Sequence, residues 1–433
     1  MQLSLNKKPL NKKYIDIFMV ILFFGIFLRF AIGIGYYNPQ DTLWYKTWAI
    51  GLNDGMFDVY SRAEELSLDY PPLYLFFLKI TGGIYKAIGD DLHNYTEMFL
   101  MKLWPILGDI ICAVALFYVF KKESPKTGLV ASALWMFNPS TIFNCAFWGQ
   151  TDSIMCLLLL LSFVLLERGK PIAAAVVFAL AGMTKYQCLF FTPIFLAELF
   201  YRYGFAKFLK GIISAAATVA VVFVPFMIGS KNPMLFFDVY LGGQGTYPYC
   251  TLSAYNIYGI FGLNWKEDTV GTPSLYTLSL ILVLVLIALM IYVYLRAERK
   301  SVWVLGFLFM NTLFMFMTRM HERYQFVVLI FILMAAVLHR HRGFFYCFMA
   351  ISIITFLNQA IPMFAWRSED VSSALGNYSS VSVFDNYYNA FMVIFSLINL
   401  AIYVVSAYIS VKFMFSKDKE EITKDNDKEE IAV

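Results

Sequence analysis

Long apolar stretches recur along this chain from end to end, and clusters of basic residues separate them. Stretches such as 14–35, 97–120 and 391–413 are long enough to cross about 30 Å of hydrocarbon as helices. Of the 433 residues, 60% are hydrophobic and only 15% are charged, whereas soluble domains are about half apolar and a quarter charged. The sequence therefore predicts an all-α polytopic membrane protein. Its basic residues lie at the helix ends, so no nucleic-acid partner is expected.

The basic clusters predict the orientation of the helices. They include Lys121-Lys122, Arg168–Lys170 and Arg340–Arg342, and the positive-inside rule places all of them in the cytoplasm. An even number of crossings must then separate neighbouring clusters. We expect about twelve transmembrane helices with both termini inside, at 14–35, 97–120, 127–146, 151–166, 171–184, 187–200, 211–229, 273–295, 302–318, 324–338, 344–365 and 391–413.

The segment 71–88 is the exception to this pattern. It is apolar enough to cross, but a crossing there would place Lys121-Lys122 outside and invert every later helix. We therefore expect a re-entrant or interfacial helix within a long first outer loop, 36–97. The other long outer loops are predicted at 230–272 and 366–389. Residues 1–415 would form a single transmembrane domain, followed by a disordered cytoplasmic tail at 416–433.

Two carboxylates stand out in the first outer loop. Asp41 follows the first predicted helix and precedes an aromatic-rich stretch. A partly desolvated carboxylate suits a general base, because burial raises the proton affinity of a carboxylate, but an aspartate before a helix can equally be its N-cap. Asp69 precedes Tyr70, Pro71 and Pro72, and the paired prolines hold it rigidly. Asp69 is either the cap of a helix that begins at Pro71 or a second functional carboxylate.

A tight outer turn is predicted at 148–152. Gly149 allows the turn, and Asp152 can cap the helix that follows. Trp148, Gln150 and Asp152 also provide an aromatic face, an amide and a carboxylate, which together can bind a sugar. Both interpretations remain open from the sequence.

Cationic side chains are predicted at two further outer positions. The ammonium of Lys185, between two short helices, either pairs with an anion or extends to the outer headgroups. The segment from Arg319 to Arg323 contains four ionisable side chains in five residues. Arg319 and Arg323, spaced i, i+4, would share a helix face and match phosphate oxygens. A structural ion pair with Glu322 is the alternative.

The order of these motifs resembles the GT-C class of membrane glycosyltransferases. The resemblance covers roughly residues 30–330 and is strongest to prokaryotic proteins related to the second mannosyltransferase of GPI-anchor assembly. The glucosyltransferases of asparagine-linked glycan assembly are more distantly similar. It rests on Asp41, Asp69–Pro72, Trp148–Asp152, Thr184–Gln187, Ser253–Asn256 and His321–Tyr324.

The resemblance implies an inverting enzyme that moves one sugar, with mannose as the candidate, from a polyprenyl-phosphate donor to a glycan or lipid-linked acceptor. It implies an active site outside the cytoplasm. Asp41 would be the general base and Asp69 a second carboxylate. The remaining matches are donor-phosphate ligands at Lys185, Arg319, His321 and Arg323, and sugar or acceptor contacts at Trp148, Gln150, Asp152, Tyr255 and Asn256.

Asp41 lacks the neighbouring acid that metal-dependent members of this class carry, so we predict neither a metal nor another cofactor. The expected location is a bacterial or archaeal plasma membrane, with the endoplasmic reticulum membrane and a lumenal site as the alternative.

Two other functions are compatible with this pattern. A secondary transporter or flippase would explain twelve crossings equally well. It would, however, place ionisable residues near the middle of the membrane and show internal symmetry, whereas the polar residues here gather at one end of the helices. A scaffold subunit without activity is the third possibility, and Asp41 together with the Arg319–Arg323 cluster argues against it.

Overall fold

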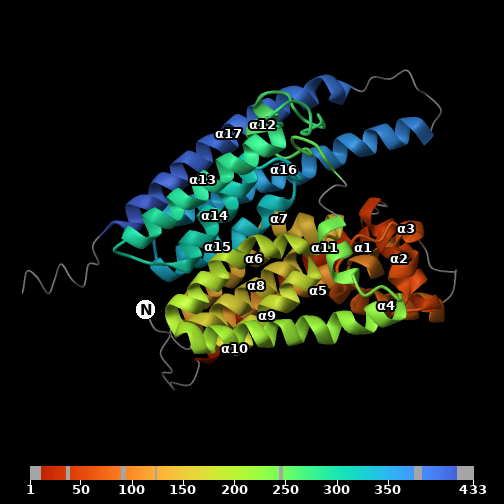
Figure 1. Cartoon of the computed structure of the whole chain (residues 1–433), viewed down its shortest axis with the longest axis horizontal. Coiled ribbons are helices and arrows are strands. Elements are labelled where there is room, and N and C mark those ends of the chain that lie inside the picture. The colour runs from red at the N-terminus through yellow and green to blue at the C-terminus, as the bar shows by residue number, and fades with distance from the viewer. Residues whose placement is uncertain are drawn as a thin grey trace, which may run out of the picture. The chain divides into compact units, whose positions relative to one another are not determined.

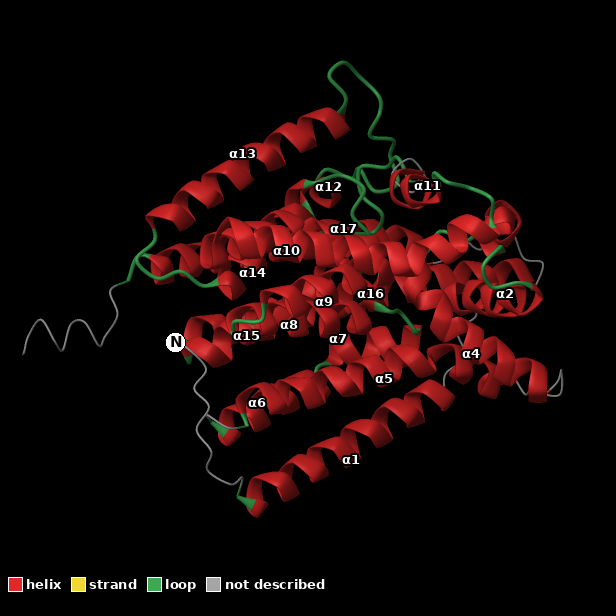
Figure 2. Cartoon of the chain, turned by 60° about the horizontal axis from the view of Figure 1, so that its bottom comes forward, coloured by secondary structure: helices red, strands yellow, loops and turns green. Residues whose placement is uncertain are grey.

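The computed structural model describes residues 11–35, 40–88, 94–121, 124–242, 247–374 and 383–416. This part of the chain is helical and contains no strand, only isolated β-bridges (Figure 2). Six of its helical segments are long and apolar enough to cross a membrane: Lys12–Gly35, Tyr95–Phe120, Tyr186–Gly229, Leu275–Arg296, Arg342–Phe364 and Ala390–Met414. These segments confirm the predicted all-α membrane protein, whereas the count of twelve crossings stays a prediction.

The described helices follow one another along the chain as Figure 1 shows. Their bounds are α1 (Lys12–Gly35), α2 (Gln40–Asp54), η1 (Val59–Arg62), α3 (Ala63–Leu66), α4 (Pro72–Ile88), α5 (Asn94–Phe120), α6 (Pro125–Met136), α7 (Pro139–Ile142), η2 (Phe143–Trp148), α8 (Asp152–Glu167), α9 (Pro171–Thr184), η3 (Tyr186–Phe191), α10 (Thr192–Gly229), α11 (Leu235–Gly242), α12 (Ile257–Ile260), α13 (Leu275–Arg296), α14 (Val302–Phe316), η5 (Tyr324–Val327), α15 (Val328–His339), α16 (Arg342–Ala374) and α17 (Val383–Met414).

The chain forms two compact units. The first contains Met1–Pro248 and the short segment Thr355–Ala360 of α16, and the second contains Tyr249–Ile354 and Ile361–Val433. In the first unit, α8 packs against α5 and α9, and α9 packs against α10. In the second unit, α14 packs against α13, α15 and α17.

The predicted helix 127–146 is wrong as a single helix. α6 ends at Met136, and Asn138 begins the next turn by accepting a hydrogen bond from the Ser140 amide at 2.8 Å. The break follows from Pro139, which has no N–H and disfavours helix at the residue before it. A π-helical turn, η2, then leads to Gly149.

The predicted helices 187–200 and 211–229 correspond to η3 and α10, because α10 spans the ten residues between them. α10 is interrupted at Gly204, whose φ of 71° and ψ of 174° are not helical. A Cβ atom placed on Gly211 would lie 2.9 Å from Leu199 Cδ2, so the two parts of α10 fold back on each other. Glycine permits this turn because positive φ carries no Cβ clash.

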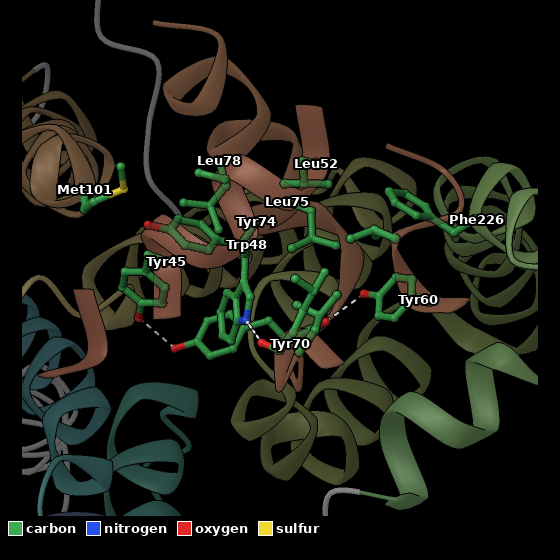
Figure 3. Close-up of a cluster of buried hydrophobic side chains, with 14 of the residues drawn as sticks. Tyr45, Trp48, Leu52, Tyr60, Tyr70, Tyr74, Leu75, Leu78, Met101 and Phe226 are labelled. Atoms are coloured by element: carbon green, nitrogen blue, oxygen red, sulfur yellow. Dashed lines mark hydrogen bonds between the residues drawn. The ribbon is translucent and has the colours of Figure 1, made fainter. Parts of the chain in front are cut away.

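The segment 71–88 forms a helix, α4, that is not among the six long apolar segments. It packs against α2 around a cluster of buried aromatic and aliphatic side chains (Figure 3). Within this cluster the Tyr45 and Tyr70 hydroxyls lie 3.0 Å apart, and Trp48 Nε1 donates to the Leu66 carbonyl at 2.9 Å. The cluster fixes the orientation of α2, which begins beside Asp41.

Two predicted boundaries need correction in the C-terminal part. α16 continues to Ala374 and α17 begins at Val383, so helix extends into the predicted outer loop 366–389 from both sides. Residues 375–382 and the predicted disordered tail beyond residue 416 lie outside the described residues.

Candidate active site

Asp41 lies within the first turn of α2, and its side chain reaches the turn after η2. Its Oδ2 atom accepts a hydrogen bond from Trp148 Nε1 at 2.9 Å and another from Gln150 Nε2. Trp148 is a donor only, so the bonded Asp41 oxygen must act as an acceptor. Asp41 is half-buried, and within the described part of the chain its Oδ1 accepts no hydrogen bond. This carboxylate therefore has one oxygen that accepts two hydrogen bonds and one that accepts none from the described residues.

Gln150 connects Asp41 to a buried ion pair. Its Oε1 lies 3.4 Å from Lys185 Nζ, and Lys185 Nζ lies 2.5 Å from Asp152 Oδ1. Lys185 and Asp152 are only 2% and 3% exposed. Lys185 therefore has the anionic partner that an ammonium at membrane depth requires, rather than extending to the headgroups.

The polar chain continues beyond Asp152. Asn144 Nδ2 donates to Asp152 Oδ2 at 2.9 Å and to Gln359 Oε1 at 3.1 Å, and Gln359 Nε2 donates to Ser140 Oγ at 2.8 Å. Asp152 is the first residue of α8, and Thr151 is the N-cap residue, so Asp152 does not cap this helix. Asn144 and Gln359 could not be identified from the sequence, because their role depends on contacts between distant segments.

A second buried ion pair, also missed from the sequence, joins Arg29 of α1 to Asp109 of α5. Arg29 Nη2 is 2.5 Å from Asp109 Oδ2, and both side chains are fully buried. Asp109 Oδ1 accepts hydrogen bonds from Trp135 Nε1 at 2.9 Å and from Ser153 Oγ at 2.8 Å. This pair ties α1 and α5 to the start of α8. In the sequence, the only indication of this pair was that Arg29 and Asp109 each lie within an apolar stretch.

Gly149 makes the close approach in this turn possible. Its φ is 88°, and a Cβ atom there would lie 2.9 Å from Lys102 Cγ and 3.2 Å from Thr42 Cγ2. Lys102 is fully buried on α5 and was also not identified from the sequence. A glycine is therefore required here for both backbone conformation and space.

A Gly149→Ala variant is expected to displace Trp148 and Gln150 from Asp41 and to lower activity by roughly 100-fold, since small misplacements of reacting groups have effects of this size. Gly169→Ala is the matched control, because Gly169 has a φ of 77° but nothing within 4 Å of the added Cβ. Activity and thermal unfolding of both variants measure the difference. Equal activity in the two variants would contradict the role of the close approach.

Asp69 is exposed, three residues before α4 begins at Pro72. The residue that follows it is anchored: the Tyr70 carbonyl accepts a hydrogen bond from Tyr60 Oη at 2.7 Å, and Figure 3 shows its hydroxyl facing Tyr45. Tyr45 is one helical turn after Asp41. The segments that carry the two carboxylates are therefore linked through a buried tyrosine pair. The role of Asp69 as a second carboxylate stays a prediction.

The segment Arg319–Arg323 in the second unit is not helical, so the prediction of a shared helix face is wrong. Arg319 has a φ of 63°, and Arg319 N donates to the Tyr249 carbonyl at 3.0 Å. Leu252 N donates to the Met320 carbonyl at 2.9 Å. These bonds attach the segment to the loop that follows residue 248.

Each arginine of this segment has a carboxylate partner. Arg319 binds Asp268 through two bonds, Nε to Oδ2 at 2.8 Å and Nη2 to Oδ1 at 3.0 Å, and its guanidinium lies over the Tyr276 ring at 4.1 Å. Arg323 Nη1 lies 2.8 Å from Glu322 Oε1. The structural ion pair with Glu322, which was the alternative from the sequence, is therefore present for Arg323. The pairing of Arg319 with Asp268 was not predicted.

Glu322 is fully buried beside the side chains of His321 and Arg323. Its Oε2 lies 3.8 Å from His321 Nδ1, and its Oε1 binds Arg323. Burial alone would raise the pKa of Glu322, but the interaction with His321 and the charge of Arg323 lower this pKa below its ordinary value. Glu322 is therefore held in its ionised form, and it offsets part of the positive charge predicted for this segment.

The predicted sugar contacts Tyr255 and Asn256 are also buried in the second unit. The Tyr255 carbonyl accepts a hydrogen bond from Asn399 Nδ2 at 2.7 Å, and the Tyr255 ring stacks on Phe395. Asn256 caps α12 by accepting from the Tyr258 amide at 3.1 Å. Both residues therefore have structural contacts, and their role in sugar binding stays a prediction.

Within the described ranges, no group of three or more His, Cys, Asp or Glu side chains is arranged to hold a metal ion. Asp41 instead has neutral donors as neighbours, the Trp148 indole and the Gln150 amide. The arrangement suits a carboxylate that accepts a proton from a substrate.

A comparison with protein families decides the class of the protein. The model of glycosyltransferase family 87 matches residues 69–319, which is more than half of the chain. The chain belongs to glycosyltransferase family 87. No curated protein matches it significantly.

Membership of family 87 makes the protein a glycosyltransferase and supports the predicted enzyme over a transporter or a scaffold. The matched range includes Asp69, Asp152 and Lys185, and it ends at Arg319. Asp41, His321 and Arg323 lie outside it. The family assignment therefore establishes the type of reaction, while the roles of individual residues rest on their geometry.

Proposed function

We propose that the protein transfers a single sugar, with mannose as the candidate, from a polyprenyl-phosphate donor to a glycan or lipid-linked acceptor. The reaction takes place on the extracytoplasmic side of a bacterial or archaeal plasma membrane, and residues 1–415 act as one GT-C-like catalytic domain. The observation that carries this proposal is the Asp41 carboxylate, whose Oδ2 accepts hydrogen bonds from Trp148 and Gln150 while no described residue donates to its Oδ1. The resemblance to relatives of the GPI-anchor mannosyltransferase supports the choice of donor and sugar.

The proposed chemical step uses the Asp41 carboxylate as its base. Asp41 Oδ1 takes the proton of the acceptor hydroxyl while that oxygen bonds to the anomeric carbon of the sugar. The bond from the anomeric carbon to the phosphate oxygen breaks, and its electron pair leaves with the polyprenyl phosphate. Attack opposite to the leaving group inverts the anomeric centre. Positioned base catalysis of this kind contributes about 10²–10⁴-fold to a rate.

The donor phosphate requires cations, because negative charge grows on it as it leaves. Of the four predicted ligands, His321 and Arg323 both lie beside the buried carboxylate of Glu322. Arg319 and Lys185 each face a carboxylate of their own, Asp268 and Asp152. All four residues are proposed as candidate ligands of the donor phosphate.

A donor screen with purified protein tests this function. Synthetic polyprenyl phosphates carrying different single sugars are offered beside nucleotide sugars, and the product is analysed by mass spectrometry and for anomeric configuration. We expect transfer from a polyprenyl-phosphate sugar with inversion, and none from a nucleotide sugar. Transfer from nucleotide sugars alone, or retention of configuration, would overturn the proposal.

A further inference from the structure

The hydrogen bonds that run from Lys185 through Gln150 to Asp41 have a fixed order of donor and acceptor. Lys185 can only donate hydrogen bonds, so the Gln150 carbonyl oxygen must face the ammonium. The Gln150 Nε2 group then faces Asp41, which requires Asp41 Oδ2 to be an acceptor. A rotated amide would place its NH₂ against the ammonium and its oxygen against the carboxylate, and both contacts would be repulsive.

Asp152 holds the ammonium that sets this direction. Its Oδ1 lies 2.5 Å from Lys185 Nζ, and its Oδ2 accepts from Asn144. Lys185 itself is the C-cap residue of α9, with an extended backbone. The ion pair is buried, and buried pairs keep their geometry better than exposed ones because water does not compete for their hydrogen bonds.

This geometry argues against a phosphate at Lys185. A phosphate bound to the ammonium would bring a second anion beside the buried Asp152 carboxylate, which carries its own charge. Desolvating two like charges together is costly. The ammonium also contacts the Gln150 amide, which in turn contacts Asp41.

We propose that Lys185 and Asp152 are positioning residues that act on Asp41 through the Gln150 amide. They orient the amide so that it binds Asp41 Oδ2 and leaves Oδ1 for the acceptor hydroxyl. This inference rests on the proposed role of Asp41 as the base. It replaces the assignment of Lys185 to the donor phosphate and the assignments of Gln150 and Asp152 to sugar contact.

A double-mutant cycle tests the inference. Lys185→Met, Gln150→Leu and the combined variant are compared with the wild type for kcat and for the KM of the donor. We expect each single variant to lower kcat by roughly 10- to 100-fold, as for other misplaced catalytic groups. The combined variant should be no slower than the slower single variant, because the proposed effect of Lys185 on Asp41 passes through Gln150. The donor KM should stay within about twofold of the wild-type value.

Two further variants keep the cycle interpretable. Lys185→Arg preserves a donor-only cation and should restore part of the lost kcat. If Lys185→Met fails to fold because Asp152 is left as an unpaired buried charge, Lys185→Met/Asp152→Asn takes its place in the cycle. Lys170→Met is the matched control at the other, exposed end of α9, and it should keep wild-type kinetics.

The outcomes separate this inference from the proposed function. Independent effects of the two substitutions would show that Lys185 does not act through Gln150, and a donor KM that rises whenever Lys185 is replaced would show phosphate binding. Either result would overturn the inference alone. A wild-type protein that transfers no sugar from any polyprenyl-phosphate donor would instead overturn the proposed function.

Discussion

An Asp41→Asn variant is expected to fold normally and to transfer sugar about 10²- to 10⁴-fold more slowly than the wild type, because it loses the proton acceptor. Asparagine keeps the shape of the side chain. Its carbonyl oxygen can still accept the hydrogen bonds from Trp148 and Gln150 that reach Oδ2. Its NH₂ group would replace Oδ1, and an amide nitrogen cannot take a proton from the acceptor hydroxyl.

The measurement is the initial rate of transfer at saturating donor and acceptor, together with the thermal unfolding of the purified variant in detergent. Asp54→Asn is the matched control, because Asp54 lies at the other end of α2 with its side chain 72% exposed. It should keep wild-type activity. Full activity in a folded Asp41→Asn protein would remove Asp41 as the base and leave the carboxylate with a structural role only.

The second large effect concerns stability. Arg29→Met is expected to lower the free energy of unfolding by about 3–5 kcal/mol, because it leaves the buried Asp109 carboxylate without its cation. Arg29 is fully engaged in the wild type: besides Asp109, it donates to the Met136 carbonyl at 2.8 Å and to the Gly25 carbonyl at 3.1 Å. The loss of these bonds adds to the loss of the ion pair.

The combined variant Arg29→Met/Asp109→Leu should be more stable than Arg29→Met alone, because no buried charge is left without a partner. It should remain below the wild type, since Trp135 and Ser153 lose their acceptor, at about 1–3 kcal/mol for each unsatisfied group. Asp54→Asn again is the control, because its exposed contact with Arg62 at 3.7 Å contributes about 0–1 kcal/mol. Unfolding curves of detergent-solubilised protein measure all three. A combined variant less stable than the single variant would contradict this account.

Hydrophobic length predicted most of the helices. The segment 171–184 forms α9 with the expected bounds, and 273–295 and 391–413 correspond to α13 and the larger part of α17. The wrong helix prediction arose where a residue within an apolar stretch disfavours helical backbone. Pro139 breaks the predicted helix 127–146, which composition alone does not show.

The sequence predicted which residues belong to the candidate site better than it predicted which of them bind one another. Asp41, Trp148, Gln150, Asp152 and Lys185 were all singled out, and the structure joins them in one hydrogen-bonded chain. Their sequence neighbours suggested separate roles in capping, sugar binding and phosphate binding. The actual partners are far apart along the chain, so spacing could not reveal them.

The sequence by itself determined that this protein is a helical membrane protein, because helices satisfy their own backbone hydrogen bonds and the length of each apolar stretch is a local property. Tertiary structure alone decided which charges pair. Burial makes each unpaired charge costly, so Arg29 finds Asp109 and Lys185 finds Asp152 across 80 and 33 residues of chain. The same packing decided that Asp41 Oδ2, and not Oδ1, accepts the hydrogen bonds from Trp148 and Gln150.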